Sequence, residues 1–123
     1  MERTQFENLQ VYQLSEKIAD GLWNVVSGWK QFARDTVGKQ MVRSADSIGA
    51  NIAEGTGRGS FQDNRRYVRM ARGSLHETRH WLRRAYCRGL LTEQQLVFFK
   101  PLMDELSPRL NAYLNSIGPR DPE

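Results

Sequence analysis

The sequence lacks most of the features that mark secreted, membrane-bound or disulfide-stabilised proteins. It has 123 residues and a single cysteine, Cys87, so no disulfide can form within the chain. No apolar run approaches the roughly 20 residues that a membrane-spanning helix needs. The polar residues 1–8 also lack the apolar centre of a secretory signal. These absences favour a cytoplasmic protein without a membrane partner.

Signals for β-strands are also missing. Apolar and polar residues do not alternate over a useful length anywhere in the chain. Apolar residues instead recur at intervals of three and four in the segments 9–29, 35–54, 61–88 and 92–117. Amphipathic helices with short connections predict an all-α protein, an up-down-up-down four-helix bundle. We expect one domain over residues 1–118 and a disordered tail over 119–123.

Polar residues and glycines mark the expected helix ends. Asp35 is the expected N-cap of the second helix, and Gly55 lies where a left-handed cap would end it. Ser60 and Thr92 are the expected N-caps of the third and fourth helices. Gly89 is the expected cap at the end of the third.

The fourth apolar pattern contains two prolines, Pro101 and Pro108. Each removes a backbone donor and costs about 3 kcal/mol or more inside a regular helix. Because the apolar register continues past both prolines, the sequence predicts either a kinked helix or two abutting helices.

Positive charge is concentrated in the third segment, residues 61–88. It holds eight arginines, no lysine and two acidic residues, Asp63 and Glu77, so its local charge is +6, whereas the whole chain carries +4. The helical period divides this segment into two neighbouring faces. The apolar face consists of Val68, Ala71, Leu75, Thr78, Leu82 and Ala85. The arginine stripe consists of Arg65, Arg69, Arg72, His76, Arg79 and Arg83.

Besides a solvated face with scattered ion pairs, the arginine stripe has two compatible interpretations. The planar guanidinium group suits phosphate, which favours electrostatic binding of RNA or DNA. The stripe also borders the apolar face, where a second subunit can approach and pair with the same arginines. The candidate nucleic-acid-binding residues are Arg58, Arg65, Arg69, Arg79 and Arg83.

Two short motifs carry weaker hypotheses. His76, Glu77 and His80 match the H-E-x-x-H pattern of zinc peptidases, but a third ligand is missing at the usual spacing and arginines surround the motif. A zinc hydrolase is therefore a remote alternative. The glycine-rich segment 55–60 lacks the preceding strand of a phosphate-binding loop, so a helix cap with a flexible turn is favoured. We expect no enzymatic activity, metal or cofactor.

Three segments resemble the signatures of the four-helix bundle proteins that are encoded in 23S rRNA intervening sequences. They are LQVYQ at 9–13, QMVRSADSIGANIAEG at 40–55 and ARGSLHE at 71–77. The resemblance extends over nearly the whole chain. It implies a bundle that assembles into a homopentamer, and it brings no catalytic residues. A relative of the family works with a reverse transcriptase and nucleic acid, which implies a protein partner that acts on nucleic acid.

The residues that match these signatures are expected to serve the architecture or the oligomer. They are Arg43, Asn51, Glu54, Gly55, Arg72, Ser74 and Glu77. We hypothesise that Glu54 or Glu77 pairs with Arg43 or Arg72, within or between subunits, because polar groups beside apolar seams need partners. Gly49 stands where many members have proline, so the second helix is expected to be less kinked here.

The sequence as a whole predicts a non-enzymatic, self-associating bundle that binds RNA or DNA through its third helix. The alternative is a structural scaffold whose arginine stripe is used in subunit contacts.

Overall fold

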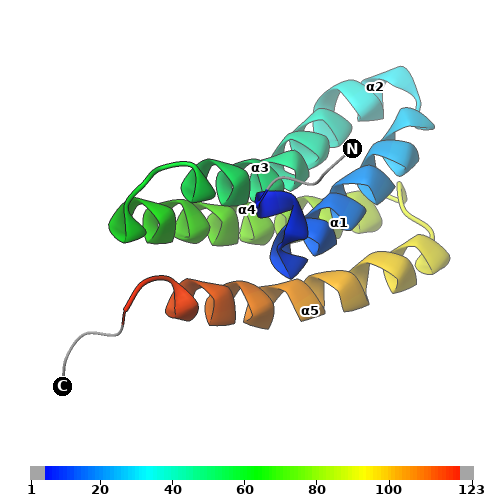
Figure 1. The fold of residues 1–123 in the computed structure, drawn as a ribbon. Helices are drawn as coiled ribbons and strands as arrows, with labels where there is room; N and C mark the ends of the chain where they lie inside the picture. Colours follow the sequence, from blue (N-terminus) through cyan, green and yellow to red (C-terminus); the bar gives the residue numbers. More distant parts are fainter. Residues whose placement is uncertain (1–4, 120–123) are drawn as a thin grey trace.

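The computed structural model describes residues 5–119 and shows an all-α fold without strands in that part of the chain (Figure 1). Its four long helices are α1 (Gln10–Ser27), α3 (Lys39–Thr56), α4 (Phe61–Cys87) and α5 (Glu93–Ser116). A short 3₁₀ turn, η1 (Phe6–Asn8), precedes α1. A helical turn, α2 (Gln31–Ala33), and a π-helical turn, η2 (Arg34–Gly38), lead into α3. Residues 120–123 of the expected tail lie outside the described residues.

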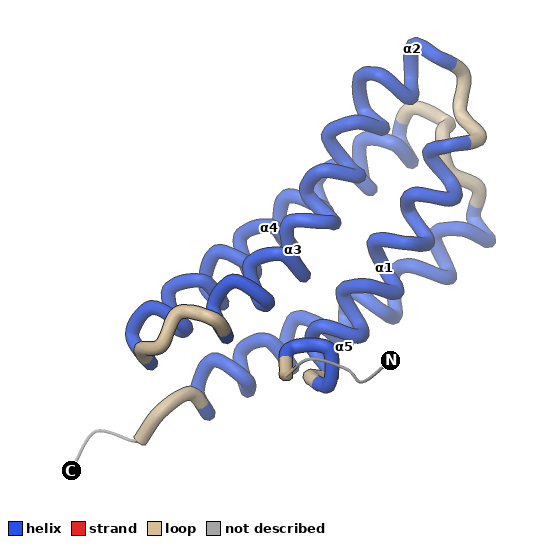
Figure 2. The backbone as a smooth tube through the Cα atoms, turned by 45° about the horizontal axis from the view of Figure 1, so that its top comes forward, coloured by secondary structure: helices blue, strands red, loops and turns tan. Residues whose placement is uncertain are grey.

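The long helices form the predicted four-helix bundle. Each runs back along the one before it, and each packs against two others: α1 and α4 both contact α3 and α5 (Figure 2). Among the described residues, the backbones of the diagonal pairs, α1 with α4 and α3 with α5, do not approach each other closely. Consequently α1 and α4 lie on opposite sides of the bundle.

The apolar face predicted for the third helix is buried in full. All six of its residues, from Val68 to Ala85, are buried against the core. The one polar member, Thr78, is fully buried, and its hydroxyl lies 2.8 Å from the carbonyl oxygen of Ser74 and 3.0 Å from Oγ of Ser44 on α3. This contact satisfies a hydroxyl that would otherwise be costly to bury.

Three of the expected helix ends are confirmed. The Ser60 side chain accepts a hydrogen bond from the backbone N–H of Asp63 at 3.1 Å, so it caps α4. Thr92 and Gln95 form a reciprocal capping box at the start of α5. Gly89 adopts a positive φ of 72° just after α4, which a residue with a side chain rarely adopts.

The predicted start of the second helix is wrong. Helical structure begins at Gln31, after the extended residue Lys30, and Asp35 lies inside it. Thr36 also behaves as an interior residue, because its hydroxyl donates to the carbonyl oxygen of Phe32 at 2.7 Å. No side chain among residues 5–119 caps this helix, so the sequence carries no capping signal at its true start.

The predicted role of Gly55 is also wrong. α3 continues to Thr56, and the loop residue with a positive φ is Gly59, at 77°. Gly55 is buried inside the helix where α3 and α4 approach each other. A Cβ atom there would lie 2.5 Å from Oδ1 of Asn64 and 3.1 Å from Cβ of Tyr67. Gly55 therefore permits close helix packing and does not serve as a left-handed cap.

The two prolines do not divide the last helix, so the prediction of two abutting helices is wrong. α5 runs continuously through Pro101 and Pro108. Both prolines are exposed. Water can therefore reach the carbonyl groups of Val97 and Asp104, which lose their intrahelical partners. The apolar register survives because the interruptions lie on the solvent side.

The packing around Gly55 predicts opposite effects for two glycine-to-alanine substitutions. Gly55→Ala should lower the free energy of unfolding by roughly 1–3 kcal/mol, because the added methyl group must separate α3 from α4. Gly73→Ala should raise it by roughly 0.5–1 kcal/mol, since a Cβ at Gly73 meets nothing within 4 Å and alanine favours a helix. Urea unfolding at one protein concentration measures both. Similar changes for the two variants would contradict this account of Gly55.

Candidate nucleic-acid interface

The structure divides the arginine stripe of α4 into two rows. Arg65, Arg72 and Arg79, which we call the inner row, are seven residues apart and reach across to α5. A spacing of seven is two helical turns, so all three point to the same neighbour. The arginines of the inner row therefore make contacts within the bundle.

Each arginine of the inner row has a defined partner on α5 or just beyond it. Arg65 donates to the carbonyl oxygen of Ile117 at 2.8 Å, where the carbonyl end of the helix dipole favours a cation. Arg72 donates to Oδ1 of Asn111 at 3.2 Å.

Arg79 makes two contacts with α5. Its guanidinium donates to the carbonyl oxygen of Met103 at 3.0 Å and lies 3.2 Å from Oδ1 of Asp104. Asp104 also accepts from Lys100 at 2.9 Å. The hydrogen bonds from Lys100 and Arg79 lower the pKa of Asp104, so this group stays ionised at neutral pH.

A second row lies beside the inner row and makes no hydrogen bond or ion pair with α5 in the described part of the chain. Arg69, His76 and Arg83, which we call the outer row, are also seven residues apart, and all three are exposed. Neither arginine forms a hydrogen bond or ion pair with any residue in 5–119. With a rise of about 1.5 Å per residue, the outer row spans about 21 Å of α4. It is therefore the part of the stripe that is available to a ligand.

Three further arginines extend the positive surface of α4. Arg66 and Arg88 are exposed and Arg84 is half-buried. Arg66 lies 3.6 Å from Asp63, and its guanidinium also covers the Tyr67 ring at 4.9 Å. The sequence prediction omitted these three because they fall outside the stripe. The sequence signal that could have included them is the use of arginine alone, without lysine, along the whole segment.

Arg58, the remaining candidate, lies in the loop between α3 and α4. It forms an ion pair with Glu54 at 2.8 Å, and its guanidinium lies over the ring of Tyr67 at 4.9 Å from the ring centroid. It also donates to the Tyr67 hydroxyl. Arg58 is exposed, but its charge is partly balanced by Glu54.

The hypothesis that Glu54 or Glu77 pairs with Arg43 or Arg72 is wrong within a single chain. Glu54 pairs with Arg58, and Oε2 of Glu77 accepts from Nε1 of Trp81 at 3.2 Å. The partner of Arg72 is Asn111. Pairing between subunits remains a prediction.

The other signature residues mostly support α3 and α4 locally. The side chain of Asn51 donates to the carbonyl oxygen of Ser47 at 2.9 Å, and the carbonyl oxygen of Ser74 accepts from Thr78. Arg43 is exposed on α3.

The H-E-x-x-H motif lies on the exposed side of α4. His76 and His80 are both exposed, and His80 packs edge-on against the ring of Trp81. Glu77 contacts the indole of the same tryptophan. Within residues 5–119, no group of three or more histidine, cysteine, aspartate or glutamate side chains is gathered for a metal ion.

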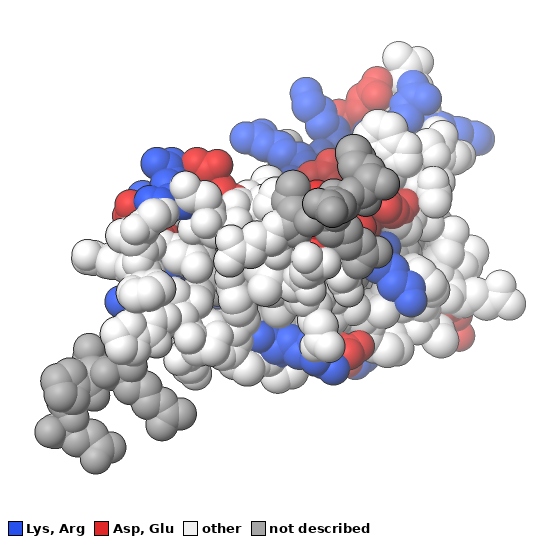
Figure 3. Space-filling view, in the orientation of Figure 1, with Lys and Arg blue, Asp and Glu red and all other residues white. Residues whose placement is uncertain are grey.

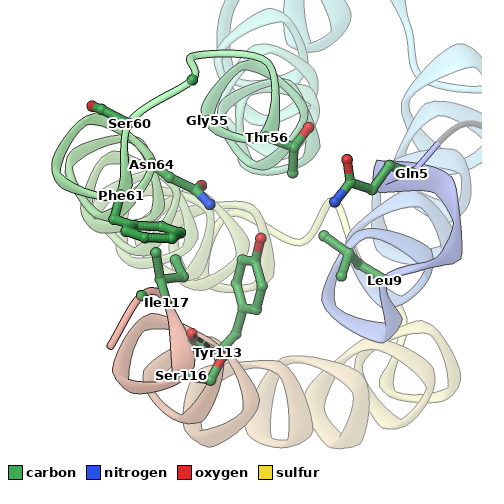
Figure 4. Close-up of a pocket in the computed structure, with 12 residues that line it drawn as sticks. Gln5, Leu9, Gly55, Thr56, Ser60, Phe61, Asn64, Tyr113, Ser116 and Ile117 are labelled. Atoms are coloured by element: carbon green, nitrogen blue, oxygen red, sulfur yellow. Dashed lines mark hydrogen bonds between the residues drawn. The ribbon is translucent and has the colours of Figure 1, made fainter. Parts of the chain in front are cut away.

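Other surfaces are less suited to a polyanion. The face seen in Figure 3 carries both positive and negative side chains, with uncharged surface between them. A cleft of about 620 Å³ lies between the start of α1, the α3–α4 loop and the end of α5 (Figure 4). Its polar side chains include Gln5, Asn64 and Tyr113, and none of the residues in 5–119 that line it is charged. Its described lining therefore offers no cation to a phosphate.

The fold and the basic surface of α4 define a small helical bundle protein whose excess positive charge lies on a single helix, α4. The family model described as 23S rRNA-intervening sequence protein matches residues 7–112. The chain belongs to this family, which confirms the resemblance found in the sequence.

One similar solved structure is the crystal structure of a protein with unknown function from the S23 ribosomal protein family of Bacteroides thetaiotaomicron. It is 24% identical, with a TM-score of 0.76, and the match covers 86% of this chain and 99% of that chain. At this identity the similarity supports the fold alone. No curated protein matches the chain. No helix within the described residues is long and apolar enough to cross a membrane.

The division into two rows predicts different stability effects for neighbouring arginines. Arg79→Ala should lower the free energy of unfolding by about 1 kcal/mol, because it removes the contacts with Met103 and Asp104. Arg83→Ala should change it by less than about 0.5 kcal/mol. Urea denaturation at matched protein concentration compares the two. Equal losses would show that the inner row does not hold α5.

Proposed function

We propose that the protein is a non-enzymatic, self-associating bundle that binds RNA or DNA electrostatically through α4. The observation that carries this proposal is the outer row, where Arg69 and Arg83 are exposed and make no ion pair within residues 5–119. A cation without an internal partner can neutralise a phosphate without first breaking a native contact. Arginine also offers phosphate a bidentate fork, which lysine cannot.

The contacts within the bundle change which arginines are the best candidates for binding phosphate. Arg69 and Arg83 become the main phosphate contacts, and Arg66, Arg84 and Arg88 extend the same surface. Arg58, Arg65 and Arg79 already have partners, so their main contribution is to the electric field that attracts a polyanion. Binding of this kind depends on charge and spacing and does not depend on base sequence.

Self-association is the second part of the proposal. Large apolar side chains are exposed at Trp23 (61%), Phe32 (82%) and Val97 (71%). Such side chains are common at subunit interfaces, and the resemblance to the family supports a homopentamer. This observation also favours the alternative function, a structural scaffold. We further propose a cytoplasmic location and a protein partner that acts on nucleic acid.

The outer row can be tested by the salt dependence of nucleic-acid binding. The double variant Arg69→Gln, Arg83→Gln should flatten the plot of log K against log salt by about two units, one for each lost phosphate contact. Fluorescence anisotropy with a labelled RNA, over a series of salt concentrations, measures the slope.

A matched control removes the same charge elsewhere. The double variant Lys17→Gln, Arg34→Gln alters exposed cations on α1 and η2 and should leave the slope nearly unchanged. Identical slopes for the two double variants would mean that net charge alone governs binding. No affinity of the unmodified protein at low salt would exclude the proposed function.

Asp104 provides a test in the opposite direction. Asp104→Asn removes the negative charge beside Arg79 and Lys100, while Arg79 keeps its bond to Met103, so the local positive potential rises and binding should tighten several-fold at low salt. Glu105→Gln is the matched control, because it makes the same charge change but frees Arg109. The same anisotropy titration compares the two. Equal tightening by both variants would count against a specific role for the α4 side of the bundle.

A further inference from the structure

A small cleft opens where the last turns of α4 meet the first half of α5. Its volume is about 340 Å³. The apolar floor comes from Leu82, Leu96 and Met103, of which Leu82 and Met103 are almost completely buried. Tyr86 forms one wall, and this residue is 42% exposed. We call this site the Tyr86 cleft.

The rim of the Tyr86 cleft is positively charged. Arg79, Arg83 and Lys100 all line it. Asp104 holds Arg79 and Lys100 at its edge through distances of 3.2 Å and 2.9 Å. Arg83 has no ion pair within the described residues and belongs to the outer row. A cationic rim above an apolar, aromatic floor is a different chemistry from the rest of the α4 surface.

The chemistry of the cleft limits its occupant. The apolar floor and the exposed tyrosine ring suit a flat aromatic group, while the cations suit a phosphate. Its volume lies near the lower end of the range for ligand sites, so it suits one nucleotide and not a longer segment. A base in a duplex is stacked and paired, and it cannot enter a cleft of this size without leaving the helix. An unpaired base has its ring faces free.

We propose that the Tyr86 cleft holds one unpaired nucleotide of a single-stranded nucleic acid. The base lies against Tyr86 and the apolar floor, and its phosphate lies between Arg83 and Lys100. The inference rests on the proposed function and goes beyond it, because it gives the arginine surface a preference for single strands over duplexes. The outer row then continues along the strand from the cleft.

The arrangement along α4 is consistent with a strand that starts in the cleft. Tyr86 follows Arg83 by three residues, so their side chains leave the helix on adjacent positions of one face. Arg83 is therefore shared by the cleft and the outer row. The next arginine of that row, Arg69, lies about 21 Å along the helix, a distance that a few nucleotides of an extended strand can cover.

The test compares a labelled single-stranded RNA of about 12 nucleotides with the same sequence as a duplex, both at about 50 mM salt. Tyr86→Ala should weaken single-strand binding about tenfold, which is the usual effect of losing one stacked base. Duplex binding should stay within about twofold, since the outer row is intact. Tyr86→Phe should bind the single strand like the unmodified protein, because the ring face remains.

Phe61→Ala is the matched control, because it removes an aromatic side chain that is 58% exposed and lies at the opposite end of α4 from Tyr86. It should leave both affinities unchanged. Thermal unfolding of each variant verifies that the fold is kept. A variant of Tyr86 that alters both probes equally would show a general effect on the surface and would overturn the cleft.

The remaining outcomes separate this inference from the proposed function. If both probes bind and Tyr86→Ala changes neither, the cleft is excluded while electrostatic binding stands. If neither probe binds at low salt, the proposed function itself fails. Uridine monophosphate can be added at the same concentration of nucleotide units as the strand. If it displaces the labelled strand, the cleft binds a free nucleotide and the strand assignment is overturned.

Discussion

The arrangement of this protein's surface depends on the packing of one face of α4 between α3 and α5. Burial of the face from Val68 to Ala85 fixes the rotation of α4 about its own axis. Once that rotation is fixed, each arginine has a fixed direction. Arg65, Arg72 and Arg79 meet α5, while Arg69 and Arg83 face solvent. The hydrophobic effect, which is not directional, thereby determines where the positive charge is exposed.

The contacts of the inner row hold α4, and with it the exposed arginines, in position. Arginine contacts at three heights along α5 oppose rotation or sliding of α4, because each uses a planar, directional donor. Individually such contacts at partly exposed sites are worth about 1 kcal/mol or less. They contribute mainly by fixing α4 relative to α5, because two of them end on main-chain carbonyl groups that cannot move independently of α5.

Sequence reasoning predicted the features that depend on neighbours along the chain. The buried face of α4, the N-cap at Ser60 and the capping box at Thr92 all follow from spacing, and all are present. The errors involve contacts between distant residues or a missing signal. Gly55 was assigned to a cap because the side chains of Asn64 and Tyr67 that approach it belong to another helix. The start at Gln31 has no capping side chain, and the prolines of α5 are tolerated because both are exposed.

The candidate site shows the same limit. Arg65 and Arg69 share one stripe in the sequence, and the position of α5 decides that Arg65 has a partner while Arg69 has none within residues 5–119. Three acidic residues, Glu16, Asp20 and Asp46, line a groove between α1 and α3. Burial, and then the charge of Asp20, raise the pKa of Asp46.

Because α1 lies diagonally across the bundle from α4, the negative groove and the outer row face different directions. The net charge of +4 is therefore distributed unevenly over the molecule. An uneven distribution of this kind would orient an approaching polyanion toward α4 and away from the groove.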